Sequence, residues 1–243
     1  MGLTAKVIAF QEKIIQKVGF HWQKVRMCEL GAMCMRTMND LPAKKYYIEE
    51  KKVLEHVSID WNGMFGSLPI NLSFPVPKEL LNRFNLVTDY GTIEHVDNQY
   101  QVFKNVHDVC SMNGVIIHTL PTLNYWKDHC KYFYSKDFFV ELARVCDYKI
   151  LDLEIKNPYN AFAPKTKMVF IAFLKNNNNE FISEKDFNEL EIFEFKNLNN
   201  TFSYYLEKIL WKLWGLRYYI LNSHNKNLKR IFRKILNKFI RRS

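Results

Sequence analysis

The chain has 243 residues, of which 48% are hydrophobic and 15% aromatic, which suits one packed α/β domain with additional elements and excludes global disorder. Its formal net charge of +10 comes from the C-terminal end, because residues 201–243 hold eleven Lys or Arg and one acid, whereas the first 200 residues hold 24 of each sign. The neutral body argues against a nucleic-acid groove on the main domain, and no run of 18 apolar residues offers a membrane span.

The five cysteines are odd in number and show no CxxC spacing. This pattern favours reduced thiols in a cytoplasmic protein over a disulfide framework or a zinc site. The first 21 residues predict an amphipathic helix, and the lysines scattered through them exclude a signal peptide. Its apolar face is formed by Val7, Ile8, Phe10, Ile14, Ile15 and Val18.

Two strands with polar ends are predicted next. The first, at residues 25–30, ends in the turn Glu29-Leu30-Gly31-Ala32, where a glycine lets a ligand approach the backbone without a side-chain clash. The second, at residues 56–59, ends at Asp60 and Trp61. A carboxylate at a strand end is suited to pair with two ribose hydroxyls. The alternative for Asp60 is that it only begins a turn.

Residues 68–73 predict a short third strand that carries Asn71, before Pro75 and Pro77 exclude a helix. The most informative stretch follows at residues 84–96. An apolar run typical of a strand in a parallel sheet ends there in the polar turn Asp89-Tyr90-Gly91-Thr92, and a helix begins soon after. Open α/β sheets bind their ligands at such strand ends.

The rest of the sheet is predicted from three further apolar segments. Residues 113–119 form a fifth strand that ends near His118, and a helix begins at Ser135. Residues 149–155 and 167–174 then predict a final hairpin. A hairpin in this place distinguishes the sheet from the ordinary dinucleotide-binding fold.

Over residues 22–175 these segments resemble class I S-adenosylmethionine (SAM) dependent methyltransferases. Residues 84–96 are similar to the fourth strand and loop of that family, often "fDlV...LEHV", and residues 113–121 are similar to its "pGG.l.i.tP" turn and fifth strand. The turn at Glu29 keeps the acid and first glycine of the family's E/D-x-G-x-G-x-G loop, whereas Met33 and Met35 stand where later glycines are expected. The resemblance implies a three-layer, Rossmann-like α/β fold with a mostly parallel sheet, an antiparallel last strand and a C-terminal helical extension.

The resemblance also implies a cofactor site for SAM, with S-adenosylhomocysteine as the product and no metal. The residues expected to bind the cofactor are Glu29, Gly31, Ala32, Asp60, Trp61, Asn71, Thr88, Asp89, Tyr90 and Gly91. Methyl transfer to oxygen needs a base, and imidazole suits that work near neutral pH. The candidate bases are His129 and, behind it, His118 and His95; each of them could instead be a structural hydrogen-bond donor.

Residues 175–180 form a polar break, which divides the chain into an N-terminal helix (1–21), a methyltransferase domain (22–175) and a tail (176–243). The tail predicts two helices, at residues 204–220 and 228–242. The second has apolar residues at helical spacing opposite Lys and Arg, which is typical of a helix in a membrane interface. Packing against protein and binding of nucleic acid are the alternatives.

Together these features predict a cytoplasmic SAM-dependent methyltransferase, peripheral at the inner face of the membrane. Its acceptor is expected to be a small molecule, methylated on an oxygen of a sugar or another cell-envelope glycan precursor, with no specific nucleic-acid partner. Two alternatives stay open. One is a non-catalytic scaffold with a methyltransferase-like fold, favoured by Met33 and Met35; the other is a nucleic-acid methyltransferase that uses the basic tail as an arm.

Overall fold

The computed structural model describes residues 2–37, 40–123, 130–159 and 166–194. The chain divides into two compact units, Met1–Phe195 and Lys196–Ser243. All described residues belong to the first unit. The two predicted tail helices and the candidate base His129 lie outside the described residues.

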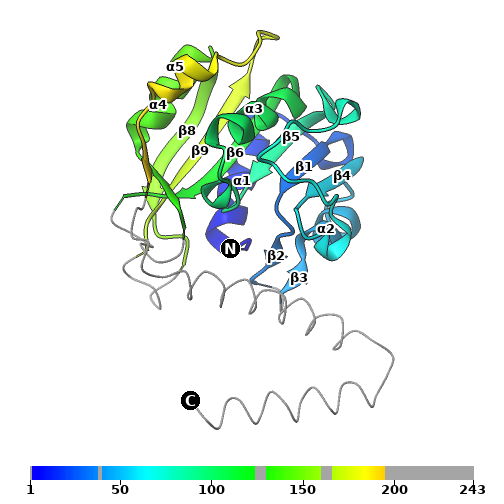
Figure 1. The fold of residues 1–243 in the computed structure, drawn as a ribbon. Coiled ribbons are helices and arrows are strands. Elements are labelled where there is room, and N and C mark those ends of the chain that lie inside the picture. Colours follow the sequence, from blue (N-terminus) through cyan, green and yellow to red (C-terminus); the bar gives the residue numbers. More distant parts are fainter. Residues whose placement is uncertain (1, 38–39, 124–129, 160–165, 195–243) are drawn as a thin grey trace. The chain divides into compact units, whose positions relative to one another are not determined.

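A six-stranded sheet forms the centre of this unit, with the strand order β4-β1-β5-β6-β9-β8 (Figure 1). β4, β1, β5 and β6 are mutually parallel, and β9 runs antiparallel to both of its neighbours. The prediction of a mostly parallel sheet with an antiparallel last strand is therefore confirmed. The strands are β1 (Arg26–Leu30), β4 (Glu55–Ile59), β5 (Phe84–Asp89), β6 (Cys110–Pro121), β8 (Lys149–Lys156) and β9 (Met168–Lys175).

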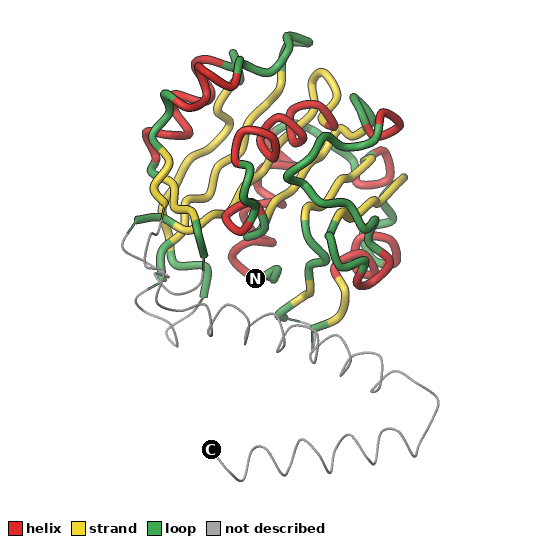
Figure 2. Tube along the Cα trace, in the orientation of Figure 1, coloured by secondary structure: helices red, strands yellow, loops and turns green. Residues whose placement is uncertain are grey.

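Helices cover both faces of the sheet, which gives three layers (Figures 1 and 2). One face carries α3 (Gln99–Val109), α4 (Lys136–Val145) and α5 (Glu184–Asn188), and the other carries α1 (Ala5–Lys17) and α2 (Ala43–Glu49). Two small antiparallel pairs join β2 (Cys34–Met35) to β3 (Leu41–Pro42) and β7 (Tyr132–Tyr134) to β10 (Ile192–Glu194). The short 3-10 helices are η1 (Trp22–Lys24), η2 (Met64–Gly66), η3 (Lys78–Leu80) and η4 (Ile93–His95).

Aromatic side chains fill the core on the α3 and α4 face. Phe103 of α3 packs edge-on against Phe138 of α4, with 5.4 Å between ring centroids, and packs at a tilt against Phe187 of α5, with 5.5 Å between ring centroids. Such pairs contribute about 0.5–1.5 kcal/mol each beyond their buried area. The acidic and aromatic segment beyond residue 180 therefore packs on the sheet through Phe187, which is 1% exposed.

Helix α1 packs against the opposite face of the sheet. Phe10 packs edge-on against Phe170 of β9 at 5.4 Å, and Gln11 is 2% exposed. The Gln11 Oε1 atom accepts hydrogen bonds from the hydroxyls of Tyr47 at 2.6 Å and Tyr90 at 2.7 Å. Because Tyr47 belongs to α2 and Tyr90 follows β5, one buried amide joins three elements of the fold.

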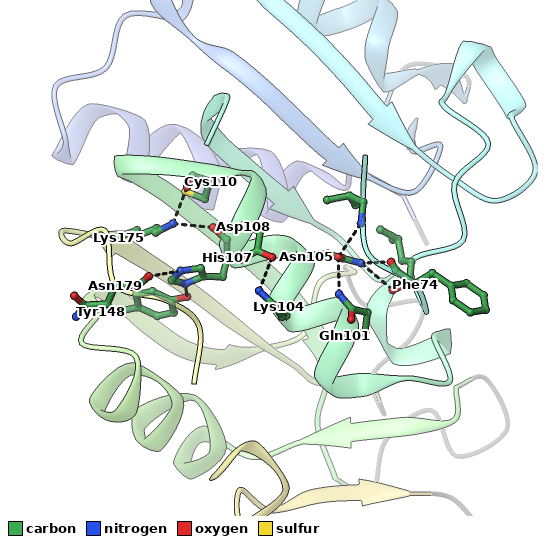
Figure 3. A network of polar contacts seen from close by, with 12 residues as sticks. Phe74, Gln101, Lys104, Asn105, His107, Asp108, Cys110, Tyr148, Lys175 and Asn179 are labelled. Atoms are coloured by element: carbon green, nitrogen blue, oxygen red, sulfur yellow. Dashed lines mark hydrogen bonds and ion pairs between the residues drawn. The ribbon is translucent and has the colours of Figure 1, made fainter. Parts of the chain in front are cut away.

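The predicted third strand at residues 68–73 is wrong. Leu68 makes only an isolated parallel bridge to Ile59, and the chain beyond it forms turns. Pro69 has no N–H to continue a ladder. The loop is instead held by Asn105 of α3, which donates to the carbonyls of Leu72 at 3.0 Å and Phe74 at 2.9 Å (Figure 3).

A second buried polar network holds the segment that follows β9 (Figure 3). Lys175 donates to the carbonyls of His107 and Cys110, both at 2.9 Å. The His107 Nε2 atom lies 2.8 Å from the Asn179 carbonyl, which can only accept, so Nε2 carries the proton and Nδ1 accepts from the Tyr148 hydroxyl at 2.6 Å. These bonds tie the last strand and the loop after it to the end of α3.

Candidate active site

The strand order reverses between β1 and β5. From β1 the chain continues outward to β4, and from β5 it continues in the other direction to β6. Open α/β sheets bind ligands in the crevice outside the carboxyl ends of their strands at such a reversal. The turns after β1, β4 and β5 therefore form the candidate ligand site.

Two glycines with left-handed backbone conformations begin the turns on either side of this reversal. The φ angle is +84° at Gly31 after β1 and +97° at Gly91 after β5. The Thr92 hydroxyl donates to the Leu30 carbonyl at 3.0 Å and joins the two turns. A Cβ atom on Gly31 would lie only 2.4 Å from both Thr92 Oγ1 and Met33 Cε, so only glycine fits here without rearrangement.

Met33 and Met35 are core residues in this structure. They are 6% and 1% exposed and pack with α1 and α2. After Gly31 the chain enters the β2–β3 pair instead of a glycine-rich loop, and the Leu3 N–H bonds to the Cys34 carbonyl at 2.7 Å. The departure from the family's glycine pattern therefore has a structural cause, because apolar side chains anchor a small hairpin there.

Asp60 joins the turn after β4 to the turn after β1. Its Oδ2 atom accepts a hydrogen bond from the Ala32 N–H at 2.9 Å, and its Oδ1 atom accepts one from the Asn62 N–H at 3.2 Å. The residue is half-buried, and each oxygen keeps acceptor capacity for a further donor. The neighbouring Trp61 is 58% exposed. Asp60 thus does begin a turn, and its carboxylate still has capacity for a hydroxyl donor.

Asp89 and His118 lie together beneath the turn that carries Gly91. Asp89 Oδ1 accepts from the backbone N–H groups of Thr92 at 2.9 Å and Ile93 at 3.4 Å, and Oδ2 lies 3.1 Å from His118 Nδ1. Asp89 and His118 are each 1% exposed. The His118 ring packs near Phe139, with 6.0 Å between ring centroids. The His118 ring is therefore enclosed between Asp89 and the aromatic core beside Phe139.

The remaining predicted residues are more widely spread. Tyr90 is fully buried and its hydroxyl faces α1, while Thr88 is buried with no partner for its Oγ1 among the described residues. Asn71 is exposed, and its side chain accepts from the Ser73 N–H at 3.0 Å within the loop. The structure therefore gathers Gly31, Ala32, Asp60, Asp89 and Gly91 at the reversal and places Asn71 in a separate turn.

Glu29 faces His56, a residue that sequence analysis did not assign to the site. His56 Nε2 lies 3.7 Å from Glu29 Oε2, and both side chains are enclosed. Burial raises the pKa of Glu29 to about 8, and burial lowers the pKa of His56 to about 3. Both groups are thus neutral near pH 7. Among the described residues nothing bonds Glu29 Oε1 or either His56 nitrogen.

Glu94, in η4, is a second buried carboxyl beside the reversal. It is 1% exposed, and its Oε2 atom has no hydrogen-bond partner within the described segments. Burial, and then the charge of Asp89, raise its pKa to about 8. The neighbouring His95 is more exposed, and its Nε2 atom lies 3.8 Å from Glu94 Oε1. Periodicity could not identify Glu94, since an acid after a strand end is equally typical of an exposed first turn.

In the part of the chain that the structure describes, no three His, Cys, Asp or Glu side chains converge in a way that could hold a metal ion. The five cysteines are buried, and no disulfide joins them. Across residues 2–37, 40–123, 130–159 and 166–194 there is also no helix of sufficient length and hydropathy to cross a membrane.

Several solved structures are similar to this fold. The 1,6-didemethyltoxoflavin-N1-methyltransferase of Burkholderia thailandensis, solved with 1,6-didemethyltoxoflavin and S-adenosylhomocysteine bound, matches with a TM-score of 0.51 at 12% identity, over 72% of this chain and 80% of its own. A candidate sarcosine dimethylglycine methyltransferase from Galdieria sulphuraria matches with a TM-score of 0.52 at 11% identity, over 71% of this chain and 85% of its own.

A candidate SAM-dependent methyltransferase from Listeria monocytogenes matches with a TM-score of 0.51 at 10% identity, over 70% of this chain and 98% of its own. No protein-family model matches the sequence, and no curated protein matches it either. At these identities the similarity establishes the fold.

Proposed function

From the class I SAM-dependent methyltransferase fold that this chain has, we propose that it binds SAM at the reversal between β1 and β5 and transfers the methyl group to a small-molecule acceptor. One observation carries the proposal. The Asp60 carboxylate, the Ala32 N–H and the turns of Gly31 and Gly91 meet at the carboxyl ends of three neighbouring strands, where a parallel sheet of this order takes its ligand.

The residues at this edge suit a nucleoside ligand. The remaining acceptor capacity of the Asp60 oxygens suits two ribose hydroxyls, and the exposed Trp61 ring beside it offers an apolar surface for a base. Gly31 and Gly91 present backbone without side chains. When bound, SAM supplies an electrophilic methyl group on a positively charged sulfur.

For catalysis, the main contribution expected of this chain is to hold the acceptor in line with the methyl group at near-attack distance. A base is needed when the acceptor is a hydroxyl. Among the described candidates, His95 has an accessible ring, whereas His118 is enclosed against Asp89 and acts as a positioning residue.

We place the acceptor among sugars and cell-envelope glycan precursors, methylated on oxygen. The sequence of residues 228–242 supports this, because a basic amphipathic pattern suits an anionic membrane surface where such precursors are assembled. The test is incubation of the full chain with methyl-deuterated SAM and a panel of nucleotide sugars and lipid-linked sugars, read by mass spectrometry. Label in a sugar hydroxyl supports the assignment, and label only in added RNA contradicts it.

A second candidate is a non-catalytic binding protein with the same fold. The observation that favours it is the Met33 methyl group, which lies with Thr92 against the open side of Gly31. This candidate predicts binding of S-adenosylhomocysteine without label transfer to any acceptor.

The tail's membrane contact is a separate proposal, tested by flotation of the full chain with and without residues 228–242 on anionic vesicles.

A further inference from the structure

Thr92 lies at the reversal between β1 and β5 and contacts the chain on both sides of it. Its hydroxyl donates at 3.0 Å to the carbonyl of Leu30, the last residue of β1, although the two residues are 62 positions apart in the sequence. The side chain also stands against Gly31, because a Cβ atom on that glycine would lie 2.4 Å from Thr92 Oγ1. A hydrogen bond and close packing therefore both place Thr92 at the candidate ligand site.

The turn after β1 is held towards β4 by backbone groups. The Gly31 N–H donates to the Ile59 carbonyl at 2.7 Å. The Ala32 N–H then donates to Asp60 Oδ2 at 2.9 Å. These two successive bonds fix the turn relative to the end of β4.

Towards β5 the same turn is held by a side chain. The ladder between β1 and β5 ends at the register pair of Leu30 and Asp89. Beyond that pair, the Thr92 hydroxyl connects the turn after β5 to the Leu30 carbonyl. The spacing between the two turns consequently depends on this threonine.

Thr92 is itself held in place by the chain around it. Its N–H donates to Asp89 Oδ1 at 2.9 Å, and Asp89 Oδ2 lies 3.1 Å from His118 Nδ1. Threonine is branched at Cβ, which restricts its χ1 angle and keeps the hydroxyl in one direction. A continuous network therefore runs from His118 on β6, through Asp89 and Thr92, to the end of β1.

We propose that Thr92 is a positioning residue for the ligand, whose hydroxyl sets the distance between the turns of Gly31 and Gly91. The inference rests on the proposed function and deepens it. A side chain of the same shape without the hydroxyl leaves the Leu30 carbonyl without this donor and puts a methyl group, which is larger than oxygen, at the contact. The two turns then move apart, and the contacts that both make with one ligand weaken together.

The test is calorimetric titration of the full chain with S-adenosylhomocysteine in two variants of this residue. Thr92→Val keeps the branched shape and loses the donor, so we expect binding about tenfold weaker than in the wild type, the effect of one lost hydrogen bond. Thr92→Ser loses a methyl group and keeps the hydroxyl, so its affinity should stay within about threefold of the wild type. Rescue by serine separates the hydrogen bond from the packing of the side chain.

Ser183→Ala is the matched control. The Ser183 Oγ atom caps α5, where it accepts from the Asp186 N–H at 3.1 Å, and it belongs to none of the turns after β1, β4 and β5. This variant also loses a hydroxyl group that makes a hydrogen bond, so its melting temperature should fall as that of Thr92→Val does. Its affinity for S-adenosylhomocysteine should stay unchanged, which separates positioning from stability.

A second pair of variants tests the contact with Gly31 and does not require Thr92→Val to fold. A Cβ atom on Gly31 would meet Thr92 Oγ1 at 2.4 Å but Thr92 Cβ only at 3.5 Å, an ordinary contact. The other atom at 2.4 Å is Cε of Met33, the far end of a flexible side chain that can move aside. Gly31→Ala should therefore cost less affinity in a Thr92→Ala background than in the wild type.

Three results would overturn the role of Thr92 and leave the cofactor site in place. They are wild-type affinity in Thr92→Val, equal weakening in Thr92→Val and Thr92→Ser, and an equal cost of Gly31→Ala in both backgrounds. If the wild type does not bind S-adenosylhomocysteine at all, the proposed function fails, and the positioning role is overturned with it.

Discussion

Asp89 and His118 are register partners on the neighbouring strands β5 and β6, and their side chains meet with 3.1 Å between Oδ2 and Nδ1. The other Asp89 oxygen accepts from two backbone N–H groups of the turn that carries Gly91. The pair therefore holds the backbone of that turn in place, and we expect any effect of the pair on a bound ligand to pass through that backbone.

Substitution of His118 tests this arrangement. His118→Leu leaves a buried Asp89 oxygen without a donor, which is expected to lower the free energy of unfolding by about 1–3 kcal/mol and to weaken binding of S-adenosylhomocysteine. His118→Asn can still donate an N–H to Asp89 and should retain more of both. Urea unfolding and calorimetric titration of the two variants measure these effects. Equal losses would show that ring packing, and not the hydrogen bond, is what matters.

Gly31 is expected to be intolerant of any side chain. In Gly31→Ala the new Cβ would lie 2.4 Å from Thr92 Oγ1 and Met33 Cε, at a φ of +84°. Gly19→Ala is the matched control, because its φ is +69° and nothing lies within 4 Å of the new atom. We expect both variants to lose about 1 kcal/mol from backbone strain, and Gly31→Ala to lose ligand affinity in addition. Thermal unfolding and ligand titration separate the two effects.

Glu29 predicts a pH-dependent stability. Its pKa is raised from an ordinary 4.5 to about 8, so the folded state binds more protons than the unfolded state between these values. This contribution to stability is fully present below pH 4.5 and is lost as the pH rises towards 8. Glu29→Gln cannot ionise, and its melting temperature should rise relative to that of the wild type between pH 5 and 8. A constant difference across this range would contradict the assigned ionisation.

Sequence patterns predicted the strands of the central sheet, because apolar runs and strand-end turns are local features. The same patterns placed Gly31, Asp60, Asp89 and Gly91 at strand ends, and the parallel topology brings those ends to one edge. The register that pairs Asp89 with His118 could not be derived in advance, since it depends on how β5 and β6 align across 29 residues of sequence separation.

The features of the fold and of the candidate site that the sequence did not predict have a common physical cause. The loop at residues 68–77 is shaped by Asn105, whose bonds to Leu72 and Phe74 span more than 30 residues and leave no periodic signal. The burial of His56 and Glu94 was not predicted, because a sequence pattern does not report burial for a polar residue. Met33 likewise interrupts a glycine motif for a reason that only the β2–β3 pair reveals.

The central claim is that the reversal between β1 and β5 is a cofactor site in which Asp60 holds the ribose. The most direct measurement is calorimetric titration with S-adenosylhomocysteine of the wild type and of Asp60→Ala, with Asp137→Ala as a control at an exposed acid of α4. We predict wild-type affinity on the order of micromolar, at least about tenfold weaker binding in Asp60→Ala, and no change in the control. Absence of binding in the wild type, or unchanged affinity in Asp60→Ala, would contradict the account.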